Sequence, residues 1–190
     1  MEIILAENHG FCYGVKRAVE MANEAANSDG KSYTLGPIIH NPQVVGRLED
    51  KGVSPVQEVS DIEEGTMIIR SHGVGPAIYE EAEEKGLHIV DATCPYVKKA
   101  QQDAKSVIED GMTLVILGEK NHPEVKSINL WANNEGIIIE DEESAKKLQI
   151  VEKMGVVVQT TFSQFKFNSI IDILEKKSKN LKVFKTICNA

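Results

Sequence analysis

Residues 113–133 read TLVILGEKNHPEVKSINLWAN and contain the unit from which this fold is built. The run 113–117 is apolar and short enough for a buried strand, and a polar turn follows it. Pro123 suits the first turn of a helix, which we predict over 123–133. A continuous apolar run before a helix is typical of a parallel strand that is covered on both faces. The stretch therefore predicts a strand, a polar loop and a helix, in that order.

The same order recurs along the whole chain. We predict a first set of strands near 2–6, 32–35, 66–70 and 88–91, with helices near 14–27, 42–51 and 76–85. A second set has strands near 113–117, 137–139, 156–159 and 182–187, with helices near 95–110, 123–133, 142–148 and 163–178. This alternation predicts the α/β class, with two similar four-stranded, mostly parallel domains over residues 1–94 and 95–190.

Composition limits the class of partner. The chain has 190 residues, 42% of them hydrophobic, and a net charge of −8, which argues against nucleic acid because phosphate binding needs clustered Lys and Arg. Glu2 and Glu7 enclose an apolar run of only four residues, shorter than the core of a signal peptide. We therefore expect a cytoplasmic protein without a membrane partner.

Three cysteines, Cys12, Cys94 and Cys188, each lie just beyond a predicted strand. An odd number without a CxxC pair favours a reducing compartment and buried, catalytic or metal-bound thiols over disulfides. Because ligands collect at the carboxyl ends of parallel strands, these thiols can meet at one point. Three thiolates suit an iron-sulfur cluster with one iron that the protein does not bind. A zinc ion with His9 or water as fourth ligand, and three buried apolar thiols, remain alternatives.

Polar side chains follow the other predicted strands. His40, His72 and His122 occupy equivalent strand ends, where imidazoles can hold a phosphate or diphosphate, although the chain contains no P-loop. Glu124 follows His122 closely and suits proton delivery, or else only complements the helix dipole. The hydroxyls at 160 and 161 indicate either a hydroxyl relay or a helix cap.

The chain closely resembles the 4-hydroxy-3-methylbut-2-enyl diphosphate reductases, the last enzymes of the non-mevalonate isoprenoid pathway. The resemblance rests on the stretches GFCYGVKRAV (10–19), GPIIHNP (36–42), RSHG (70–73), DATCP (91–95), NHPE (121–124), QTT (159–161) and TICNA (186–190). It implies a pseudo-threefold trefoil of α/β domains around a [4Fe-4S] cluster. The implied cluster ligands are Cys12, Cys94 and Cys188.

The resemblance also implies the remaining site residues and the reaction. His40, His72 and His122 would bind the substrate diphosphate, Glu124 would supply protons, and Thr160, with Thr161 beside it, would position the allylic hydroxyl. The implied activity is an iron-sulfur oxidoreductase that converts (E)-4-hydroxy-3-methylbut-2-enyl diphosphate to isopentenyl and dimethylallyl diphosphates. A small protein such as ferredoxin or flavodoxin would donate the electrons.

Family members continue for about one more domain of ordinary size. We therefore expect that the third domain of the trefoil is absent from this chain. The alternative to the reductase is an inactive fragment, or a non-catalytic module that binds a diphosphate or a metal.

Overall fold

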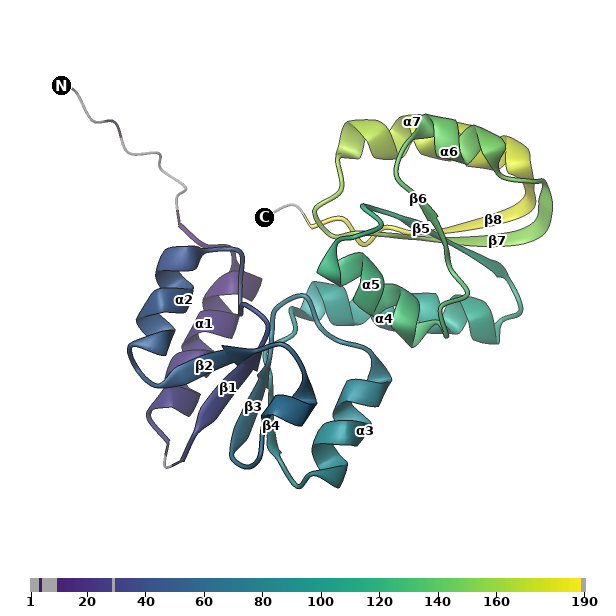
Figure 1. The fold of residues 1–190 in the computed structure, drawn as a ribbon. Coiled ribbons are helices and arrows are strands. Elements are labelled where there is room, and N and C mark those ends of the chain that lie inside the picture. The colour runs from purple at the N-terminus through teal and green to yellow at the C-terminus, as the bar shows by residue number, and fades with distance from the viewer. Residues whose placement is uncertain (1–3, 5–9, 29, 189–190) are drawn as a thin grey trace.

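The computed structural model describes residues 4, 10–28 and 30–188 (Figure 1). The first half contains α1 (Tyr13–Ala26), β1 (Ser32–Leu35), α2 (Pro42–Glu49), β2 (Val53–Val56), η1 (Val59–Asp61), β3 (Thr66–Ile69), α3 (Pro76–Glu84) and β4 (His88–Asp91). The second half contains α4 (Pro95–Glu109), β5 (Thr113–Leu117), α5 (Pro123–Trp131), β6 (Ile137–Ile139), α6 (Glu142–Lys147), β7 (Val151–Val158), α7 (Gln164–Leu174), η2 (Glu175–Lys177) and β8 (Ser178–Phe184).

The strands form two separate four-stranded sheets of the same design. Their orders are β2-β1-β3-β4 and β6-β5-β7-β8, and every pair of neighbouring strands is parallel. The second sheet thus repeats the first, strand for strand. The predicted class, two similar four-stranded parallel α/β units, is confirmed.

Both faces of the first sheet are covered because successive residues of its strands point to opposite sides. Ile68 packs with Ala18 of α1 and Leu48 of α2 in one core cluster. Its neighbours Met67 and Ile69 belong to a second cluster on the other face, which includes η1 and α3. This burial on two sides explains why β3 consists of continuous apolar residues rather than an alternating pattern.

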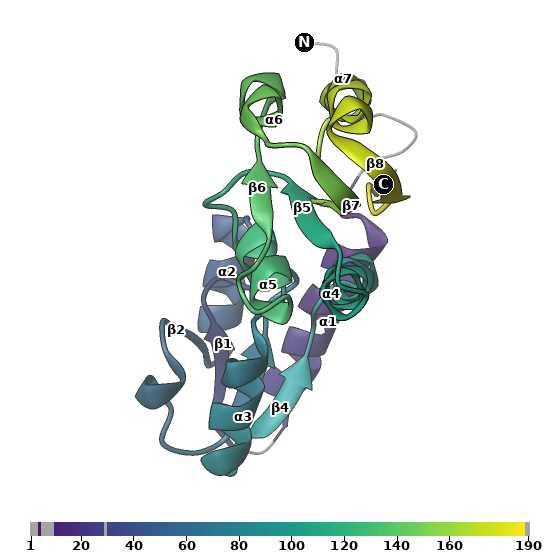
Figure 2. The ribbon, with the colours of Figure 1, turned by 90° about the vertical axis from the view of Figure 1, so that its right-hand side faces the viewer.

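The second sheet is covered in the same way, and its inner layer joins the two halves. Leu114 and Ile116 face α4 and α5, whereas Val115 and Leu117 face α6 and α7. Figure 1 shows α4 and α5 between the two sheets, with α6 and α7 on the outer side, and the turned view in Figure 2 agrees. Residues at the N-termini of α4 and α5 therefore lie at the junction of the halves.

Several predicted elements differ from the structure. The predicted strand near 2–6 lies outside the described residues, apart from Ile4, which has no regular structure. The fourth strand of the first sheet is β2, which the sequence analysis missed because Pro55 disfavours a strand; β2 is an edge strand, where proline is tolerated. The last helix ends at Leu174 rather than at 178. The last strand, β8, runs from Ser178 to Phe184 rather than over 182–187, and its polar residues form an exposed edge of the sheet.

The predicted strand near 156–159 is also too short, because β7 begins at Val151 and ends at Val158. The remaining strands and the helix starts agree closely with the predictions. Pro42, Pro76, Pro95 and Pro123 each begin a helix, as expected for proline in a first turn. No helix in the described part of the chain has the length and apolarity needed to cross a membrane. The boundary between two domains at residue 94 stays a prediction.

Candidate functional site

A cavity lies where strand-end loops of both halves meet. Its volume is about 180 Å³, and residues from distant parts of the chain line it. They include Cys12, Ser71, His72, Cys94, Glu124, Thr160, Thr161 and Cys188. The structure therefore brings all three cysteines together with the predicted acid and both predicted hydroxyls.

Backbone hydrogen bonds hold two of the cysteines in equivalent positions. Cys94 is the N-cap residue of α4, and its amide donates to the carbonyl of Ser71 at 2.9 Å. Cys188 follows β8, and its amide donates to the carbonyl of Thr160 at 2.8 Å. The third, Cys12, is the N-cap residue of α1. Two of the cysteines thus begin helices, and Cys188 is held by its backbone hydrogen bond in the segment after β8.

The surroundings of Cys94 affect the ionisation of its thiol. Burial raises the pKa of the Cys94 thiol, and although the amides of Tyr96 and Val97 oppose this, the nearby Cys12 and Cys188 thiols raise the pKa further. Thiols that disfavour each other's charge become thiolates readily when a metal supplies positive charge. The donor set therefore fits a metal group.

The spacing of the sulfurs bears on which metal group fits. Among the described residues, the three cysteines do not form a group whose ligand atoms are close enough to share a single ion. Three thiolates suit a cluster that has one iron not bound by the protein, whereas a tetrahedral zinc site would need a fourth ligand. His9, the residue considered as a fourth zinc ligand, lies outside the described residues.

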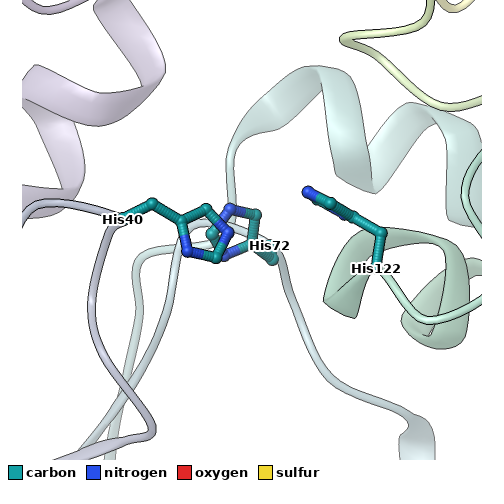
Figure 3. A group of neighbouring side chains, drawn as sticks. All are labelled: His40, His72 and His122. Atoms are coloured by element: carbon teal, nitrogen blue, oxygen red, sulfur yellow. The ribbon is translucent and has the colours of Figure 1, made fainter.

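Three imidazoles converge beside this cavity. His40 follows β1, His72 follows β3 and His122 is the N-cap residue of α5, and their side chains point toward one another (Figure 3). The ring centroids of His40 and His72 are 4.4 Å apart, and those of His72 and His122 are 5.4 Å apart. One nitrogen from each ring lies within 4.8 Å of the others. The cluster can thus contact one small ligand with three groups.

Two rings of the cluster resist protonation. The pKa of His72 is lowered to about 3 by burial, with further effects of His40, His122 and Arg70. Burial, His40 and Arg70 also lower the pKa of His122, against an opposing effect of Glu119. The Nδ1 atom of His122 accepts a hydrogen bond from the amide of Glu124 at 3.1 Å, which leaves Nε2 as the N–H donor of the neutral ring.

Glu124 is almost completely buried, with 2% of its surface exposed. One carboxylate oxygen accepts from the amide of Thr160 at 2.5 Å, and the other accepts from the Thr160 hydroxyl at 2.9 Å. Burial raises the pKa of Glu124, although both hydrogen bonds act in the opposite direction. A carboxyl group with a raised pKa that lines a cavity keeps its proton to a higher pH than a free carboxyl group and can deliver it there.

Helix α5 fixes the relative position of the two halves. The hydroxyl of Ser127 donates to the carbonyl of His72 at 2.8 Å, and the indole of Trp131 donates to the carbonyl of Val74 at 2.9 Å. Both side chains lie on the α5 face that also carries Glu124. This docking holds the end of α5 against the loop after β3, so that His72 and His122 stay together. The sequence analysis missed both residues, because neither has a motif that predicts a contact between halves.

Arg70 was also given no role by the sequence analysis. It lies at the end of β3, two residues before His72, and it is half-buried. Its only signal in the sequence is its place at a strand end beside a histidine. Its positive charge acts on two rings of the cluster.

The fold and the site define a class: parallel α/β proteins that gather thiols and imidazoles from several strand ends at one point. The family model described as LytB protein matches residues 3–190. The chain is 48% identical, over its whole length and 67% of the relative's, to the 4-hydroxy-3-methylbut-2-enyl diphosphate reductase of Geotalea uraniireducens. It is 47% identical, with the same coverage, to the enzyme of that name from Geobacter metallireducens.

Solved structures agree. A structure titled as (E)-4-hydroxy-3-methyl-but-2-enyl diphosphate reductase, the terminal enzyme of the non-mevalonate pathway, matches with a TM-score of 0.85 and 44% identity, over 98% of this chain and 68% of that one. The corresponding reductase from Plasmodium falciparum matches with a TM-score of 0.91 and 30% identity, over 97% and 60%. The chain belongs to the LytB family, the family of these reductases. It spans about two thirds of the length of the curated relatives.

Proposed function

We propose that the chain carries out the reaction for which its relatives are named. It would reduce (E)-4-hydroxy-3-methylbut-2-enyl diphosphate to isopentenyl and dimethylallyl diphosphates in the cytoplasm, where thiols stay reduced. The allylic C–O bond breaks, the hydroxyl leaves as water, and the allyl fragment gains two electrons and one proton. The whole reaction consumes two electrons and two protons.

The observation that supports this proposal most strongly is the shared cavity. Cys12, Cys94 and Cys188 line it together with Glu124 and Thr160. These cysteines would hold a [4Fe-4S] cluster, which supplies single electrons and a Lewis-acidic iron that the protein does not bind. A protein with three ligands for such a group and an acid in the same cavity has the parts that a reductive dehydroxylation requires.

The remaining residues bind and protonate the substrate. His40, His72 and His122 would hold the diphosphate and thereby direct the allylic end toward the cysteine-lined cavity. Glu124 would protonate the departing hydroxyl. Thr160 would orient the substrate hydroxyl and the Glu124 carboxylate, since its amide and hydroxyl already donate hydrogen bonds to that carboxylate. Thr161, which lines the same cavity, would complete the polar contacts.

Electrons would come from a small donor protein such as ferredoxin or flavodoxin. A second cavity of about 270 Å³ contains all three cysteines together with Tyr13 and Tyr96. Both tyrosines are more than half exposed, at 66% and 51%. An exposed aromatic surface beside the thiols suits a donor that must come close to the cluster without entering the substrate cavity.

The test is turnover by Glu124→Gln after anaerobic reconstitution, with an artificial one-electron donor. Glutamine keeps the shape of the side chain but carries no acidic proton, so we expect kcat to fall by about 100- to 10,000-fold at equal iron content. Glu135→Gln, on the exposed turn after α5, is the matched control and should react like the unmodified chain. Equal kcat in both variants would contradict the role of Glu124. A chain that binds iron and pyrophosphate without any turnover would instead be a binding module.

A further inference from the structure

Arg70 is a cation beside the imidazole cluster for which the described part of the chain offers no anionic partner. It is half-buried, and its Nε atom is buried without a hydrogen-bond partner among the described residues. The described residues also provide no ion pair for its guanidinium. Burial lowers its pKa, but an arginine remains charged at neutral pH. A partly buried charge is costly unless an opposite charge compensates it.

The position of Arg70 is not one that requires a charge for folding, as the repeated architecture shows. Arg70 follows the last residue of β3, and Gln159 follows the last residue of β7. Each side chain packs against the glycine that follows the first strand of its own half. If Gly36 carried a Cβ atom, that atom would lie 2.7 Å from Nη1 of Arg70. A Cβ atom on Gly118 would likewise lie 2.8 Å from Oε1 of Gln159. The two residues are therefore structural equivalents.

In the second half, the neutral amide of Gln159 packs against the glycine without any charge. Oε1 of Gln159 accepts from the amide of Glu119, and Nε2 donates to the hydroxyl of Thr161. An arginine cannot accept a hydrogen bond, so Arg70 cannot reproduce the first contact. What the arginine adds in the first half is a fixed positive charge.

That charge faces the histidines. Its guanidinium lies against Gly36, in the loop that carries His40, and Arg70 itself precedes His72 by two residues. In agreement with this position, Arg70 lowers the pKa of both His72 and His122. Among the groups that affect those two rings, Glu119 is the one acid, and its side chain is exposed. A fixed cation beside these imidazoles would repel a metal ion and attract an anion.

We propose that Arg70 is a fourth group of the anion site, and that it neutralises part of the diphosphate charge bound by His40, His72 and His122. This inference rests on the proposed function, because it assigns a further residue to the same site. In a chain with a net charge of −8, neutral imidazoles alone would provide no fixed charge to attract an anion. The guanidinium provides it, and the imidazoles then take up protons as the anion binds.

The test is calorimetric titration of the chain with inorganic pyrophosphate. Arg70→Gln introduces the residue that the second half uses at the equivalent place, and should weaken binding roughly 10- to 100-fold, the scale of a lost hydrogen bond between charged groups. Arg70→Lys should retain most of the affinity, since it keeps the charge. Arg47→Gln, on the exposed face of α2, is the matched control and should bind like the unmodified chain.

Two further measurements separate this role from a structural one. Because Arg70 lacks a partner, Arg70→Gln should unfold at the same urea concentration as the unmodified chain or at a higher one, whereas loss of a structural contact would lower it. The pKa values of His72 and His122, followed by NMR, should rise in Arg70→Gln. If the unmodified chain binds pyrophosphate and Arg70→Gln binds it equally well, the role of Arg70 is refuted while the proposed anion site of the three histidines stands. Absence of binding by the unmodified chain would overturn the anion site and the inference together.

Discussion

Replacement of Gly14 by alanine tests whether the three cysteines act as one ligand set. Gly14 lies in the first turn of α1, directly after Cys12 and Tyr13. A Cβ at this position would lie 2.5 Å from Sγ of Cys94 and 3.2 Å from its Cβ. Non-bonded heavy atoms need about 3.5–4.0 Å, so the sulfur must move by roughly 1 Å. Metal ligands tolerate errors of only about 0.2 Å, and Gly14→Ala should therefore disturb cluster binding.

Gly46 is the matched control, because it lies in α2 and a Cβ there would have no atom within 4 Å. Alanine favours a helix over glycine by roughly 0.5–1 kcal/mol, so Gly46→Ala should raise the melting temperature of the metal-free chain by about 1–4 °C. Gly14→Ala has the same gain but also an overlap that costs about 1–3 kcal/mol. Its metal-free chain should therefore melt below that of Gly46→Ala.

The assay is anaerobic reconstitution followed by determination of iron and sulfide and by an optical spectrum. Gly46→Ala should bind iron like the unmodified chain, whereas Gly14→Ala should retain less than roughly half of it, since one sulfur is displaced beyond the tolerance of a metal ligand. The decisive comparison is between the two alanine variants, which share the change in helix propensity. Equal iron content in both would refute the argument that Cys94 and the start of α1 border one cluster.

Two further predictions concern pH and the docking of α5. Folding lowers the pKa of His72 from 6.5 to about 3, so the unfolded chain takes up this proton first and the free energy of unfolding should decrease as the pH falls from 6.5 toward 3. Urea unfolding at pH 7 and pH 5 should therefore show a smaller loss of stability for His72→Asn than for the unmodified chain. An equal loss in both would contradict the lowered pKa. Trp131→Phe removes the hydrogen bond to the carbonyl of Val74 and should destabilise the chain by about 1–3 kcal/mol; an unchanged urea midpoint would show that α5 docks without it.

Much of the fold was predictable because local signals and the global pattern agree. Pro95 and Pro123 mark helix starts, and the apolar runs before them form strands that helices cover on both sides. Strand β2 was not predictable in this way, because Pro55 disfavours a strand. A proline is tolerated there only because β2 lies at the edge of its sheet. Strand β8 has mostly polar residues, so no periodic apolar pattern marked its start at Ser178.

The site was predictable where chemistry coincides with a strand end. Cysteine, histidine and acidic residues are recognisable by type, and the two parallel sheets carry them to strand ends that meet at one cavity. Ser127 and Trp131 were not recognisable, because their importance depends on which carbonyl of the other half they contact. Such contacts follow from the packing of α5 against the loop after β3, and no local pattern specifies that packing.

The repeated architecture explains how one site acquires different chemical groups. His40 and His122 both stand four residues after a glycine whose amide donates to the second strand of its sheet, Gly36 to Val56 and Gly118 to Ile139. The two halves thus contribute the same group at this position.

At the end of the third strand of each sheet the halves differ. The carbonyls of Ser71 and Thr160 accept the same bond from the cysteine amides of their own halves. Counting from this bond, His72 corresponds to Thr161 and Arg70 to Gln159. The first half thus places a cation and an imidazole where the second half places an amide and a hydroxyl. Because the backbone is the same, the chemical difference between these two strand ends results from their side chains and requires no change of fold.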